Sequence, residues 1–102
     1  MEINVEGRAV VLTMTECKML VYFMQHPELT LSRDRLLGAL WSSSNRPIQG
    51  PRIIDVYVRR LREKIEADPS HPRRLVTRRK GGYALLKGNE SPGGEAEPND
   101  RR

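Results

Sequence analysis

The sequence predicts an α+β domain in which three helices lie between two short β-hairpins. Two observations predict this class: three stretches with helical spacing of apolar residues follow one another, and β-favouring runs broken by glycine precede and follow them. The length of 102 residues fits one domain. A lone cysteine excludes an intrachain disulfide and a cysteine-rich zinc site, and it suits a reducing compartment. With neither a membrane span nor a signal-peptide order at its start, the chain is expected to be cytoplasmic.

The first elements are a hairpin and a helix. Residues 3–12 hold two β-favouring runs around Gly7, which predicts a tight hairpin. Thr13 and Glu16 have the spacing of a capping box, so a helix is expected to begin there. Pro27 ends this helix, because proline cannot continue the hydrogen-bond pattern.

Two further helices are expected in the middle of the chain. Ser32 is a helix N-cap, and the helix that it begins carries leucines up to Trp41. Residues 42–50 form a polar loop, and Pro51 suits the first turn of a third helix over residues 51–67. The third helix carries an apolar stripe that predicts its core-facing side, formed by Ile54, Val58, Leu61 and Ile65.

The opposite side of the third helix has an unusual composition. Arg52, Val56, Arg59, Arg60 and Glu63 fall on that side when residues are placed at 100° intervals. Arginine can read guanine edges or bind phosphates, and a small apolar group can contact a thymine methyl. This pattern is typical of a recognition helix. The alternative is a basic outer face with one exposed valine.

Positive charge is concentrated in the same part of the chain. Residues 46–80 carry eleven Lys or Arg against four Asp or Glu, a net charge of +7, whereas the whole chain carries +5. Such a concentration indicates a polyanionic partner, above all nucleic acid. A solvated basic face and an anionic membrane surface are the alternatives.

The chain ends in a second hairpin and a polar tail. Residues 75–79 alternate like a strand, residues 80–82 are expected to form a tight turn, and residues 83–86 form the return strand. Residues 88–102 are rich in glycine, proline and charge, so they are expected to be disordered. The predicted organisation is therefore a domain over residues 1–87 and a disordered tail.

Three helices followed by a basic hairpin describe a winged helix-turn-helix, and the sequence resembles the DNA-binding effector domain of OmpR/PhoB-type response regulators. The resemblance covers about residues 8–87, and its matching segments are residues 12–16, 26–27, 31–37, 40–41, 55–66 and 77–83. Two departures stand out. The wing reads Thr-Arg-Arg-Lys-Gly-Gly-Tyr where the family usually reads Thr-Val-Arg-Gly-x-Gly-Tyr, and only about two strands precede the first helix where the family has four.

The resemblance implies that the helix over residues 51–67 enters the major groove of DNA and that the wing over residues 75–86 reaches the minor groove or the backbone. The implied DNA-contacting residues are Arg52, Val56, Tyr57, Arg59, Arg60, Thr77, Arg79 and Tyr83, of which Tyr83 either touches the backbone or supports the wing. The implied contact with RNA polymerase lies in the loop, at Ser43, Ser44 and Asn45; a plain linker is the alternative. Head-to-tail dimers on direct repeats are common in the family.

The function predicted from these features is sequence-specific binding of double-stranded DNA by a bacterial two-component transcriptional regulator. The alternatives are the same domain in a receiver-less or membrane-tethered regulator, and a winged-helix module that binds proteins. No enzyme activity and no cofactor are expected, because the chain holds no catalytic triad, metal cluster or phosphate loop.

Several other polar and core residues are expected to have structural roles. Asp55 is expected to pair with an arginine or to cap a helix, and Glu63 and Glu66 are expected to be solvated, with Glu63 near Arg59 or Arg60. Trp41 is expected to anchor the core, and Cys17 is expected to be a small core residue.

Overall fold

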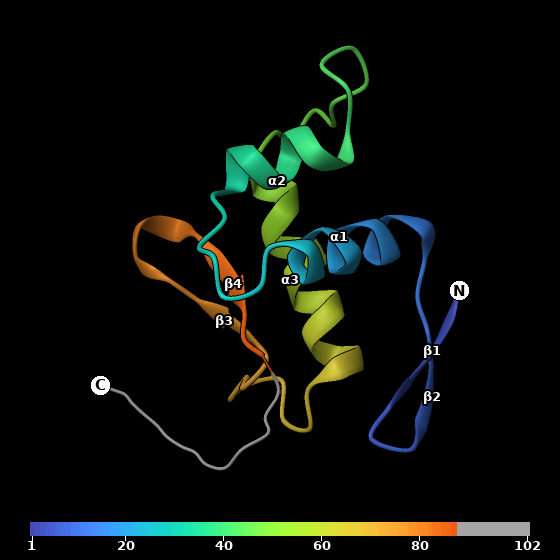
Figure 1. Cartoon of the computed structure of the whole chain (residues 1–102). Helices are drawn as coiled ribbons and strands as arrows, with labels where there is room; N and C mark the ends of the chain where they lie inside the picture. Colours follow the sequence, from blue (N-terminus) through green and yellow to red (C-terminus); the bar gives the residue numbers. More distant parts are fainter. Residues whose placement is uncertain (88–102) are drawn as a thin grey trace.

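The computed structural model describes residues 1–87 and confirms three helices between two antiparallel hairpins (Figure 1). The tail predicted over residues 88–102 lies outside the described residues. The two hairpins flank the helices on opposite sides in Figure 1. The elements are β1 (Glu2–Val5), β2 (Arg8–Val11), α1 (Met14–Gln25), α2 (Arg33–Leu40), α3 (Arg52–Ile65), β3 (Leu75–Thr77) and β4 (Tyr83–Leu85).

The first hairpin is built by a two-residue turn. Glu6 and Gly7 join β1 to β2 with φ values of 50° and 82°, the left-handed backbone that a tight hairpin turn requires. Val5 and Val10 are buried and dock the hairpin onto the helices. Local turn chemistry and alternation therefore explain this element.

Helix α1 begins with the predicted capping box. Thr13 Oγ1 accepts from the backbone N–H of Glu16, and the Glu16 carboxylate accepts from the backbone N–H of Thr13. Glu16 is only 2% exposed, and it also receives the ammonium group of Lys64 from the last turn of α3. Burial disfavours the charged carboxylate, but the lysine and the two Thr13 hydrogen bonds outweigh this effect and lower the pKa of Glu16.

Helix α3 supplies the predicted apolar stripe to the core. It is shorter than the predicted span over residues 51–67, because Glu66 leaves the helix in an extended conformation and accepts hydrogen bonds from the residues that lead into β3. Trp41 and Cys17, expected in the core, pack against it and are only partly buried. The four stripe residues, Ile54, Val58, Leu61 and Ile65, are all buried.

Strand β4 is paired along both edges. On one side it forms the wing with β3, with Thr77 opposite Tyr83. On its other side, Leu31 exchanges two backbone hydrogen bonds with Tyr83, and the N–H of Glu28 donates to the carbonyl of Leu85. The segment that links α1 to α2 therefore fixes the wing against the helices.

Candidate nucleic-acid interface

The outer side of α3 carries the predicted basic face. Arg52, Arg59 and Arg60 are exposed, and Val56 is 41% exposed, whereas the stripe on the other side is buried. The structure therefore places these four predicted site residues together on one solvent-facing side of a helix. Three guanidinium groups around one valine suit a surface that receives a polyanion.

The arginines of this face differ in their surroundings. The guanidinium of Arg60 lies over the ring of Tyr57, at 5.2 Å from the centroid, and Tyr57 packs against Trp41 with ring centroids 5.9 Å apart. Nε of Arg59 lies 3.8 Å from a carboxylate oxygen of Glu63, which confirms that expected pair. Arg60 is therefore held on an aromatic support, while Arg59 lies near a carboxylate.

The wing differs from its predicted form. Strand β3 ends at Thr77, so the alternation expected over residues 75–79 is wrong beyond that residue. The N–H of Arg78 donates to the carbonyl of Gly82, and a single 3₁₀ turn runs from Arg79 to Gly81. Gly81 has a φ of +76°, which turns the chain back toward β4. Arg78 and Arg79 are both exposed at this tip.

Arg62 joins the base of the wing to α3. Its Nε donates to the carbonyl of Leu75 at 2.8 Å, its Nη2 donates to the hydroxyl of Thr77 at 2.8 Å, and its guanidinium lies over the Tyr83 ring. Sequence reasoning missed this residue. An arginine between the two faces of a helix gave no signal, because its partners come from a distant hairpin.

Tyr83, Asp55 and Arg33 connect the wing to both α3 and α2. Nε of Arg33 donates to Oδ1 of Asp55 at 2.8 Å, and the hydroxyl of Tyr83 donates to the same oxygen. The predicted pairing of Asp55 with an arginine is confirmed. Tyr83 is only 7% exposed, and its hydroxyl points toward Asp55 on α3.

Burial and the hydrogen bonds of this cluster shift the pKa values of Asp55 and Tyr83. Partial burial works against ionisation of Asp55, but the Arg33 and Tyr83 hydrogen bonds dominate and lower its pKa. Burial, followed by the hydrogen bond to the Asp55 carboxylate, raises the pKa of the Tyr83 hydroxyl. The tyrosine therefore stays protonated as the donor, and the carboxylate stays ionised as the acceptor.

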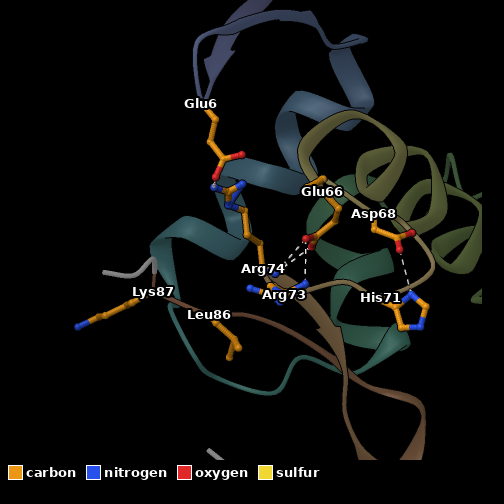
Figure 2. A pocket seen from close by; sticks show the side chains of 9 residues that line it. Glu6, Glu66, Asp68, His71, Arg73, Arg74, Leu86 and Lys87 are labelled. Atoms are coloured by element: carbon orange, nitrogen blue, oxygen red, sulfur yellow. Dashed lines mark hydrogen bonds and ion pairs between the residues drawn. The ribbon is translucent and has the colours of Figure 1, made fainter. Parts of the chain in front are cut away.

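Glu66 is buried, which corrects the expectation that it would be solvated. It is 5% exposed, and its carboxylate accepts the backbone N–H groups of Arg73 and Arg74 (Figure 2) and that of Leu75. Three amides at the start of β3 thus converge on one buried anion. The sequence did not reveal this contact, because glutamate near a helix end is ordinarily exposed.

A pocket lies beside these contacts, between the turn of the first hairpin and the loop that precedes β3 (Figure 2). Its carboxylates are engaged within the chain: Glu6 pairs with Arg74, Asp68 pairs with His71, and Glu66 accepts backbone amides. In the part of the chain that the structure describes, no three His, Cys, Asp or Glu side chains gather as a metal site would need. Within residues 1–87, no helix combines the length and apolar character needed to cross a membrane.

The loop between α2 and α3 is open to solvent. Ser43, Ser44 and Asn45 are exposed, and the hydroxyl of Ser44 lies 3.2 Å from that of Ser42. The loop also presents Ile48, whose side chain is fully exposed. The three predicted contact residues are thus accessible.

Three helices followed by a hairpin held against the third helix define a winged helix-turn-helix domain. The chain belongs to the family described as "Transcriptional regulatory protein, C terminal", whose model matches residues 7–85. It is 42% identical over 80 residues to the alkaline phosphatase synthesis transcriptional regulatory protein SphR of Synechococcus elongatus. That match covers 78% of this chain and only 30% of the relative, so the chain spans less than a third of that protein's length.

Solved structures share the fold. The Thermotoga maritima response regulator DrrB, described as an OmpR/PhoB homologue, matches with a TM-score of 0.70 and 28% identity over 79% of this chain and 36% of that one. The Klebsiella pneumoniae RstA DNA-binding domain, solved in complex with the RstA box, matches with a TM-score of 0.69 and 28% identity over 83% of this chain and 82% of that domain. The predicted family and fold are confirmed.

Proposed function

We propose that this domain binds double-stranded DNA in a sequence-specific manner, as the effector part of a two-component transcriptional regulator. The observation that carries the proposal is the exposed face of Arg52, Val56, Arg59 and Arg60 on α3, opposite a fully buried stripe. Helix α3 has the width to enter the major groove, and the wing, with Arg78 and Arg79 at its tip, would follow the neighbouring backbone or minor groove. Membership of a transcriptional regulatory family supports this assignment.

Selection of bound duplexes from a random pool tests the proposal directly. A recovered motif that competes far better than random DNA would support specific binding. Recovery of unenriched sequences would leave only a general attraction to polyanions, and failure to retain any duplex at low salt would contradict the function itself.

The two neighbouring arginines are expected to play different roles. Arg60→Ala should weaken binding to the selected site by about 1–3 kcal/mol more than binding to random DNA, because an arginine–base pair carries that discrimination. Arg59→Ala is the matched control, and it should weaken both duplexes by similar factors, as a lost phosphate contact does. If both variants lose the same affinity for both duplexes, the side chain that distinguishes bases is another one on this face, Val56 or Tyr57.

The wing is expected to act through Arg79 more than through Arg78. The family pattern matches Arg79 and leaves Arg78 at a position that is usually apolar. Arg79→Ala should therefore cost more affinity and lower the slope of log K against log salt by about one unit. Equal effects of Arg78→Ala would show that the turn over residues 79–81 aims both side chains at DNA.

The exposed loop supports a second contact. Ser43, Ser44 and Asn45 are accessible between α2 and α3, where a bound RNA polymerase could reach them. Substituting all three with alanine should leave DNA affinity unchanged and reduce transcription from a target promoter if the loop contacts polymerase; unchanged transcription would make it a linker. Head-to-tail pairing on direct repeats would appear as cooperative binding to two adjacent sites.

A protein-binding module is the alternative function from another class. Such modules favour apolar or aromatic residues at the centre of their contact surface. The α3 face offers a single half-exposed valine among three arginines, which favours DNA. We place the working protein in the cytoplasm, where a bacterial regulator meets DNA.

A further inference from the structure

We infer that Arg33 and Asp55 are positioning residues that set the place of the wing relative to α3, so that both elements reach DNA together. The inference rests on the proposed DNA binding and goes beyond it, because neither residue lies among the residues proposed to touch DNA. It concerns a cluster in which one carboxylate holds groups from two other elements.

Asp55 is the centre of this cluster. It lies in the first turn of α3, one residue before Val56 of the proposed DNA-binding face. One of its oxygens accepts both the guanidinium of Arg33, from the first turn of α2, and the hydroxyl of Tyr83, from β4. The carboxylate therefore connects both helices of the helix-turn-helix to the wing.

Arg33 continues the connection to the tip of the wing. A Cβ atom on Gly81 would lie 2.5 Å from Nη1 of Arg33, so the guanidinium lies against the backbone of the wing turn. Next to it, a Cβ atom on Gly82 would lie 2.7 Å from Cγ2 of Thr30. The two glycines thus allow the turn to rest directly on Arg33 and on the segment before α2, and a turn supported in this way has a defined position.

The exposure of the Arg33–Asp55 ion pair indicates that it affects the position of the wing more than the stability of the fold. The side chains of Arg33 and Asp55 are 41% and 42% exposed. Ion pairs with that much access to water contribute little to stability, because solvent screens them. The pair still fixes direction, since Asp55 on α3 also accepts the Tyr83 hydroxyl from β4 and Arg33 lies against the wing turn at Gly81.

A substitution that removes the charge of Asp55 distinguishes the positioning role from simple electrostatic repulsion of DNA. Asp55→Asn removes a negative charge beside a DNA-binding face, so simple electrostatics predicts tighter binding. The positioning role predicts the opposite. Because the contact with Arg33 is weakened, the wing should no longer be held in one position beside α3. The affinity for DNA should then fall by about tenfold, and the slope of log K against log salt should decrease by about one unit, as expected for lost phosphate contacts.

Glu63→Gln is the matched control. It makes the same change of charge on the same helix, at an exposed residue whose carboxylate pairs with Arg59 and not with the wing. It should bind as tightly as the wild-type chain or more tightly. Tyr83→Phe removes one hydroxyl and keeps the ring under the wing, so it should give a smaller loss than Asp55→Asn in the same direction.

The measurement is a salt titration of binding to the duplex that the full wild-type chain selects from a random pool, with thermal melts of every variant. Binding by Asp55→Asn that equals or exceeds that of Glu63→Gln would overturn the inference. So would a loss of affinity without a change of salt slope, since this would indicate that no phosphate contact of the wing was lost. Should Asp55→Asn melt below the assay temperature, Tyr83→Phe decides on the same two criteria. If the wild-type chain binds no DNA, the proposed function fails and the positioning role fails with it, which separates that outcome from the others.

Discussion

The two hairpins of this domain reach similar shapes by different means. The first hairpin turns through Glu6 and Gly7 and docks through the buried Val5 and Val10, and its polar contacts with Arg74 and with the Lys64 carbonyl are exposed. The wing has strands of only three residues each, and side chains from distant elements hold it in place. Arg62 and Glu66 hold its base, and Arg33 lies against its tip.

This difference shows which kinds of contact determine the position of a hairpin. A hairpin that only covers the core can rely on its turn and on apolar burial. The strands of the wing also bury apolar residues, Leu75 and Ala84, but its tip carries the exposed Arg78 and Arg79 and has no apolar side chain with which to dock. Hydrogen bonds from charged side chains then take over, and each of them also fixes a direction.

The largest expected effect is at the base of the wing. Glu66→Ala would leave three buried or half-buried amides at the start of β3 without an acceptor, so the free energy of unfolding should fall by about 3 kcal/mol. At the turn of the first hairpin, Glu6→Ala removes only an exposed partner of Arg74 and should cost less than about 1 kcal/mol. Urea denaturation of both variants measures the contrast, and equal losses would remove the distinction between the hairpins.

A smaller contrast is expected at the two turn glycines. Both have positive φ, at +82° for Gly7 and +76° for Gly81, so alanine strains either backbone by about 1 kcal/mol. A Cβ on Gly7 would meet no atom within 4 Å, whereas one on Gly81 would collide with Arg33. Gly81→Ala should therefore lower the free energy of unfolding by about 2 kcal/mol, roughly twice the loss for Gly7→Ala. Thermal melts that rank the variants the other way would show that Arg33 moves aside without cost.

The smallest expected effect concerns the buried acid next to the first hairpin. The pKa of Glu16 is lowered in the folded state, so its charge stabilises the fold above the unfolded pKa, and this contribution disappears as the pH falls through the folded value. Glu16→Gln can keep the helix cap but loses the attraction of Lys64, so it should cost about 1 kcal/mol at pH 7. Denaturant titrations should show the difference from wild type shrinking below about pH 4.3. A difference that persists at pH 2 would indicate a packing defect.

The sequence was sufficient for elements that local patterns define. The stripe of α3 follows from helical spacing, and the cap of α1 follows from a threonine and a glutamate three residues apart. The first hairpin follows from alternation around a glycine. In each case the residues that determine the structure are close together in the chain, so their pattern is visible without tertiary information.

The sequence was insufficient where the partners are distant. An arginine partner for Asp55 was predictable, but its identity as Arg33 depends on how α2 crosses α3. The burial of Glu66 and the short β3 strand have the same cause, because both arise where the end of α3 meets the wing. Helical spacing predicts which side of α3 the arginines occupy, whereas the sequence alone does not predict where the wing lies beside them.

The pairing of Leu31 with Tyr83 also affects how the protein can be made. The ribosome synthesises the chain from its N-terminus, so the segment between α1 and α2 waits for its strand partner until almost the whole domain has emerged. Contacts between such distant residues form slowly, because a long loop must close first. A nascent chain that stops before residue 83 would expose the apolar inner side of its helices. Such a fragment is expected to be a substrate for chaperones and proteases, and it would not work as a smaller regulator.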